Sequence, residues 1–187
     1  LQSALPSTPT VEDLQGVLDQ VERQGFVTSP AVLQVRFTST PSDSAQDSFL
    51  DLTLISSKAS VQARRLTVDR ERFAGLLKAL YRQLSRQEPL AVDDPASPSR
   101  QLHALLVEPI QDALQGQGIK TLLIAADQGL QAVPFAALND GTSFFGLNYA
   151  FGLTPSLALT PLTPAQSSST GQLALGASEF DGLAPLP

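Results

Sequence analysis

The sequence contains no cysteine, no methionine and no tryptophan, and it has a single histidine, His103. Without cysteine, the chain cannot form a disulfide framework, a thiolate metal site or a thiol nucleophile of its own. The chain begins with Leu1 and lacks methionine throughout. We therefore expect it to be a piece of a longer polypeptide.

Charge is also scarce, since charged residues make up only 16% of the chain. The net charge of −6 and the pI of about 4.6 give no basic patch of the kind that nucleic acid or an anionic membrane surface requires. No apolar run is long enough to cross a bilayer, and the N-terminus lacks a signal-peptide pattern. We expect a soluble chain with no nucleic-acid or membrane partner, in the cytoplasm rather than secreted.

Apolar residues, at 42% of 187 residues, are sufficient for a core of normal size. Helical spacing over residues 8–24 predicts a first helix, with Thr10 and Asp13 in capping-box positions. Alternating segments joined by polar turns then predict an antiparallel β-meander with one solvent-exposed face. The strands of this meander are expected at residues 31–38, 49–55 and 61–68. Asp69 next caps a strongly periodic helix.

The second half of the chain predicts helices that lead into a buried strand. Ser97 and Pro98 mark a helix start, and Pro109 predicts a kink or a restart. Residues 121–126 (TLLIAA) carry no polar alternation. This is typical of a strand covered on both faces in a parallel sheet flanked by helices.

Turn signals follow this strand. Gly129 supplies a positive φ in the turn after it, and the segment PFAAL predicts a single helical turn. An extended segment comes next, after which Pro155 and Ser156 are expected to start a short helix. Residues 173–178 (LALGAS) predict a further short buried strand.

The motifs LLIAADQGLQAVPFAALNDG, FFGLNYAFGLTPSLALT and LALGASEFDGLAPLP stand in this order along the chain. Together they resemble the amino-terminal half of a CHAT domain, a caspase-like module related to clan CD cysteine peptidases. Residues 134–138 match the Pro-Phe-Ala-Ala-Leu of the family in order, and Pro155 with Ser156 matches its later Pro-Ser pair. The resemblance covers roughly residues 100–187.

The resemblance implies an α/β fold that is caspase-like, with a partly parallel sheet flanked by helices and preceded by an antiparallel β-meander. The N-terminal helix, meander and long helix would then occupy residues 1–88, and residues 89–97 would be a linker. Residues 98–187 would form the first half of the caspase-like core. The catalytic His-Gly motif and the later Cys of active members would lie beyond this chain.

Individual polar residues each leave two interpretations open. His103 could act as a general base or could replace a packing aromatic, and its spacing beside Leu102 and Leu106 favours packing. Asp127 and Asp140 could be paired carboxylates, yet each stands in a glycine turn that explains it.

Two further groups also have a structural explanation. Ser156 could be a nucleophile, but the G-x-S-x-G elbow is absent and helix capping is favoured. An arginine group could bind an acidic partner, although most such groups are solvated surface. This group consists of Arg64, Arg65, Arg70 and Arg72.

Two hypotheses on function follow. The chain is the amino-terminal portion of a CHAT-domain protein, a caspase-like cysteine peptidase scaffold, or it belongs to a non-catalytic scaffold that binds protein partners. We expect no catalytic, cofactor or metal residue within the chain. Protein or peptide partners are expected, including tetratricopeptide repeats or other domains of the same parent chain. The residues expected to border a substrate groove are Asp127, Gln128, Gly129 and Gly176.

Overall fold

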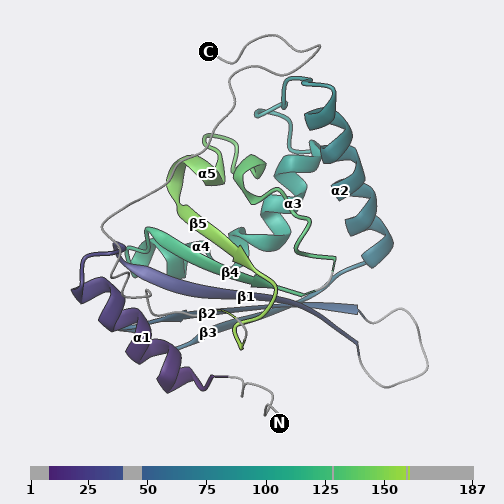
Figure 1. Ribbon diagram of the computed structural model, residues 1–187. Coiled ribbons are helices and arrows are strands. Elements are labelled where there is room, and N and C mark those ends of the chain that lie inside the picture. The colour runs from purple at the N-terminus through teal and green to yellow at the C-terminus, as the bar shows by residue number, and fades with distance from the viewer. Residues whose placement is uncertain (1–8, 40–47, 128, 159, 161–187) are drawn as a thin grey trace, which may run out of the picture.

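The computed structural model describes residues 9–39, 48–127, 129–158 and 160. Its centre is a five-stranded mixed sheet in the order β3-β2-β1-β4-β5, with helices on both faces (Figure 1). The strands are β1 (Pro30–Ser39), β2 (Ser48–Ser56), β3 (Gln62–Thr67), β4 (Thr121–Ala126) and β5 (Ala150–Thr154). The helices are α1 (Val11–Arg23), α2 (Arg70–Ser85), α3 (Pro98–Leu106), α4 (Glu108–Gly116), the 3₁₀ turn η1 (Phe135–Ala137) and α5 (Phe145–Asn148).

The sheet joins an antiparallel part to a parallel part. β1, β2 and β3 form the predicted meander, in which each neighbouring pair is antiparallel. β4 lies between β1 and β5 and runs parallel to both. The expected α/β class, with a partly parallel sheet flanked by helices and preceded by a meander, is therefore confirmed.

One face of the sheet carries the main hydrophobic core. Alternate residues of β1, β2 and β4 point into it, because side chains alternate across a strand. They pack against α2, α3 and α4, which lie together on this face (Figure 1). Fully buried members include Leu33, Leu52, Leu80, Leu106, Leu114 and Ile124. The core thus unites residues on both sides of the segment 89–97.

The second face of the sheet is covered only in part. Leu14 and Leu18 of α1 pack with Val32 and Ile55, and Leu157 joins this cluster. Leu123 and Ala125 of β4 reach the edge of the cluster and stay half-buried. The prediction that β4 is covered on both faces is right for the first face and only partly right for the second. The reason is that α1 lies mainly over β1 and β2.

The predicted helix boundaries follow the local chemistry of the sequence. Thr10 and Asp13 form the complete capping box of α1, and Asp69 accepts hydrogen bonds from the N–H groups of Glu71 and Arg72 at the start of α2. Helix α3 starts at Pro98 after the cap Ser97. The chain breaks at Val107 and restarts as α4, with Pro109 in its first turn. The predicted restart is therefore confirmed.

Two local predictions need correction. The expected helix after Pro155 and Ser156 is wrong for residues 155–158, which form bends and turns. The short helix α5 was not anticipated, and its Phe145 is buried against Phe135 and Phe151. The strand predicted at residues 173–178 lies outside the described residues. Among the described helices, none is both long and apolar enough to cross a membrane.

Candidate functional site

The parallel strands bring three segments that are distant in sequence to one edge of the sheet. Val35 pairs with Ala126, and Ala125 pairs with Thr154, so β1, β4 and β5 lie in register near the carboxyl ends of β4 and β5. In open α/β sheets, ligands bind beyond the carboxyl ends of the parallel strands. This carboxyl edge is therefore the candidate site, and it contains the sequence-predicted rim residues Asp127 and Gly129.

Asp127 is the first residue after β4. Its N–H donates to the carbonyl of Val35 at 3.0 Å, which extends the ladder with β1. Its Oδ2 lies 3.4 Å from Nε of Arg36, and the two side chains are 44% and 61% exposed. A pair as exposed as this contributes at most about 1 kcal/mol to stability. Asp127 and Arg36 are consequently available to a ligand at the edge.

The turn that follows Asp127 has the backbone that the sequence predicts. Gly129 has φ +89°, a conformation that glycine adopts without strain, and Leu130 N–H donates to the Asp127 carbonyl at 2.9 Å. The prediction for Gly129 is confirmed at the level of the backbone. Gln128 and Gly176, the other two predicted rim residues, lie outside the described residues.

The segment after the turn is held in place by side chains that are buried in the main core. Leu130, Val133, Phe135 and Leu138 are buried in the main core. The hydroxyl of Tyr81, on α2, donates to the carbonyl of Ala132. The PFAAL motif therefore acts as an anchor that holds the turn at the edge of the sheet, and η1 is its predicted single helical turn.

A polar cluster lies on the meander beside this edge. Arg65 donates from Nε and Nη2 to the two carboxylate oxygens of Asp51 at 2.6 and 2.8 Å, and Thr38 donates to the same carboxylate at 2.8 Å. The Arg65 hydrogen bonds lower the pKa of Asp51. Together with Arg36, these residues line an open cavity of about 410 Å³.

The arginine group from the sequence has internal partners in each case. Arg65 pairs with Asp51, and Arg70 stacks over the ring of Phe37 at 4.8 Å. Arg72 donates to Gln101 at 2.9 Å, and Arg64 donates to the carbonyl of Ala63 at 3.0 Å. All four side chains are on exposed residues, which agrees with the surface interpretation of this group.

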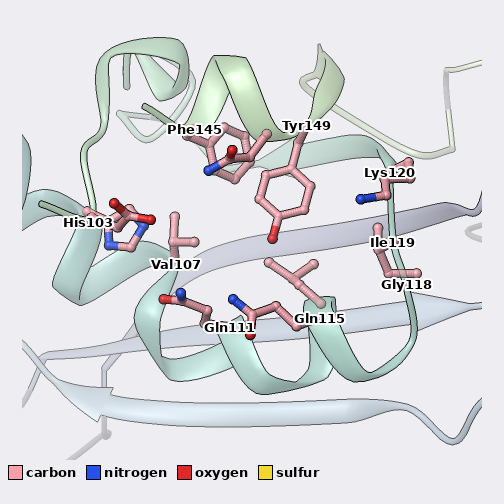
Figure 2. A pocket seen from close by; sticks show the side chains of 12 residues that line it. His103, Val107, Gln111, Gln115, Gly118, Ile119, Lys120, Phe145 and Tyr149 are labelled. Atoms are coloured by element: carbon pink, nitrogen blue, oxygen red, sulfur yellow. The ribbon is translucent and has the colours of Figure 1, made fainter. Parts of the chain in front are cut away.

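His103 and Asp140 line a different cavity, on the side of the sheet that α3 and α4 cover. His103 is 7% exposed, and burial lowers its pKa. It lines a cavity with Asp140, Ile119 and Lys120, the last two of which precede β4 (Figure 2). Asp127 lies against Arg36, and neither cavity that Asp140 lines includes Asp127, so the structure shows no carboxylate pair of Asp127 and Asp140.

The remaining candidates carry no catalytic arrangement. Asp140 accepts hydrogen bonds from Thr142 and Ser143, as its turn interpretation predicts. The two residues after Ser156, at 157 and 158, form a turn and no helix, and the carbonyl of Ser156 accepts from the hydroxyls of Thr154 and Thr160. In the part of the chain that the structure describes, no group of three or more His, Cys, Asp or Glu residues could hold a metal ion.

Sequence reasoning missed Arg36 as a neighbour of Asp127. The two residues are 91 positions apart, and only the parallel register of β1 and β4 brings them together. No local signal in the sequence could have found this pair, because strand pairing between distant segments is decided by tertiary packing.

Comparison with known proteins adds one family. The family model of the CHAT domain matches residues 96–187. No curated protein matches the chain.

Proposed function

The chain carries a CHAT domain at residues 96–187, and from this premise we propose that it forms the amino-terminal portion of a caspase-like cysteine peptidase unit. In this proposal the catalytic His and Cys come from sequence beyond the 187 residues. The residues of this chain supply the sheet, the buried anchor of the PFAAL segment and one wall of a peptide groove.

The observation that supports this proposal most strongly is the carboxyl edge of the parallel strands. Asp127 and Arg36 stand there as an exposed pair of opposite charge, and the turn beside them is held by buried residues. A rigid edge with exposed hydrogen-bonding groups suits an extended peptide, whose backbone needs donors and acceptors at fixed positions. Asp127, Gln128, Gly129 and Gly176 would border this groove.

The experiment uses the full-length parent protein and a peptide substrate that it cleaves. Asp127→Ala is expected to raise the KM for the peptide by about threefold or more with little change in kcat, because the residue binds rather than reacts. Asp93→Ala is the matched control, since Asp93 is an exposed aspartate in the loop between α2 and α3. Equal kinetics for both variants and the wild type would refute the role of this edge.

The second candidate is a non-catalytic caspase-like scaffold that binds protein partners. The exposed Asp127–Arg36 pair suits a partner surface as well as a substrate groove. The lack of cysteine fits both candidates, because the first takes its Cys from beyond the chain. In the same experiment, this candidate predicts that the parent protein shows no peptidase activity. Asp127→Ala would then weaken the capture of a protein or peptide partner, measured by titration calorimetry.

A further inference from the structure

A second cavity opens beside the amino ends of β4 and β5 and extends along α4 to His103 on α3 (Figure 2). It has a volume of about 400 Å³, within the range of small-ligand sites in proteins. Helix α4, the turn before β4 and the residues that lead into β5 surround it (Figure 2). We call it the amino-edge cavity.

The walls of the amino-edge cavity combine an apolar base with neutral polar groups. Leu114, Ile119 and Phe145 are buried and form the apolar part. Gln111 and Gln115 project from α4, one helical turn apart, so both amides stand on the same side of the helix. In Figure 2 the hydroxyl of Tyr149 points toward α4. Side-chain amides and a phenol offer both donors and acceptors, which peptide groups require.

The two ends of the cavity differ in charge. Lys120 lies at one end and His103 at the other (Figure 2). At the His103 end, Asp140 accepts from the Thr142 N–H, the Thr142 hydroxyl and the Ser143 N–H, and all three bonds end on Oδ1. Oδ2 accepts none of these three bonds and is therefore available to a ligand donor.

Neighbouring charges keep the His103 end negative. Arg100 and Glu108 line an adjoining cavity that shares His103 and Asp140 with this one. Arg100 packs over the backbone of Gly141, where a Cβ would collide with its guanidinium. Asp140 and Glu108 set two carboxylates against the one guanidinium of Arg100, and burial lowers the pKa of His103.

We propose that the amino-edge cavity binds a short peptide with free termini, with its ammonium group at Asp140 and its carboxylate at Lys120. The peptide groups would meet Gln111, Gln115 and Tyr149, and small side chains would lie on the apolar base. A nucleotide or another polyanion does not suit this site, because a single lysine faces it while Asp140 and Glu108 would repel the phosphates. This site is independent of the proposed peptidase groove.

The test is a titration of the complete 187-residue chain with trialanine. Calorimetry measures the affinity, and NMR chemical-shift changes show whether the cavity residues respond. Lys120→Gln and Asp140→Asn are each expected to weaken binding about tenfold, since each removes one charge-assisted contact. Asp140→Asn keeps the Oδ1 acceptor and so preserves the turn. Lys78→Gln, at an exposed site on α2, is the control that should bind as the wild type does.

Peptides with one terminus chemically blocked show which end of the ligand each charged residue binds. Trialanine amide should bind the wild type more weakly and be insensitive to Lys120→Gln, whereas N-acetyl-trialanine should be insensitive to Asp140→Asn. Absence of binding by the wild type at millimolar trialanine would overturn the proposal. Binding that neither variant affects would overturn it as well.

Discussion

His103 is a titratable group held inside the protein by its place on α3. Burial is the main cause of its lowered pKa and Arg100 acts in the same direction, while Asp140 and Glu108 oppose the shift. The folded protein therefore takes up a proton on this ring less readily than the unfolded chain. As the pH falls below the ordinary histidine pKa of 6.5, the unfolded state is favoured, so His103 makes the fold less stable in mild acid.

A substitution that cannot titrate should remove this dependence. Between about pH 7.5 and 5.5, the free energy of unfolding should fall less for His103→Gln than for the wild type. The difference between the two proteins cannot exceed about 1.4 kcal/mol per pH unit. The lowered pKa values of Asp13, Asp51 and Asp140 keep these carboxylates charged throughout this window. Urea denaturation at each pH measures the difference, and parallel pH profiles for the two proteins would contradict the account.

For single residues, the sequence predicted the backbone conformation of turns but did not predict which distant residues lie in contact. The turn at Asp140 and the positive φ of Gly129 follow from residue type alone. The pairing of Asp127 with Arg36, and the cavity that His103 and Lys120 both line, do not, because each depends on how distant segments pack.

Helix α2 shows how one element connects the core to the carboxyl edge. Its Phe73 and Leu80 are buried in the core, and its Tyr81 holds the loop at Ala132. The helix begins at Asp69, whose Oδ1 accepts from two N–H groups at 2.8 and 3.2 Å. These N–H groups have no partner within the helix, so the cap stabilises the first turn.

Removal of this cap should destabilise the protein measurably. Asp69→Ala is expected to lower the free energy of unfolding by about 1 kcal/mol, and Asp69→Ser should retain most of the stability because its hydroxyl also accepts from the first turn. Chemical denaturation followed by far-UV circular dichroism gives both values. If the serine variant loses as much stability as the alanine variant, capping is not the role of Asp69.

Elements with strong local signals were predictable, and elements made by packing were not. Periodic apolar residues and caps identify α1, α2 and the break between α3 and α4. Helix α5 is four residues long and is held by the contacts of Phe145 with other aromatic rings. A helix this short has no amphipathic period from which sequence could predict it.

In the part of the chain that the structure describes, one sheet is built from both halves of the sequence. Residues that match the CHAT family start at 96, yet β4 has its neighbour β1 in the segment before that match. The meander and α2 therefore complete the core on which the matched segment packs. Sequence patterns predicted each strand and the parallel character of β4. The strand order β3-β2-β1-β4-β5 could not be predicted from the sequence, because the apolar residues of a strand do not specify which strand pairs with it.

The parallel pairing of β1 with β4 is the premise of the carboxyl edge, and a cysteine pair tests it most directly. The sequence has no cysteine, so every disulfide would report the introduced pair. Gln34 and Ala125 are register partners with half-buried side chains on the same face, and adjacent strands lie within the range that a disulfide spans. Thr121 pairs instead with Pro30, about 13 Å along the strand from Gln34.

Mild oxidation of the two double variants, followed by mass spectrometry, distinguishes the arrangements. The structure predicts that Gln34→Cys with Ala125→Cys forms an intramolecular disulfide and that Gln34→Cys with Thr121→Cys does not. A disulfide in the second pair without one in the first would mean that β4 runs in another direction or register, and the carboxyl edge would not exist as described.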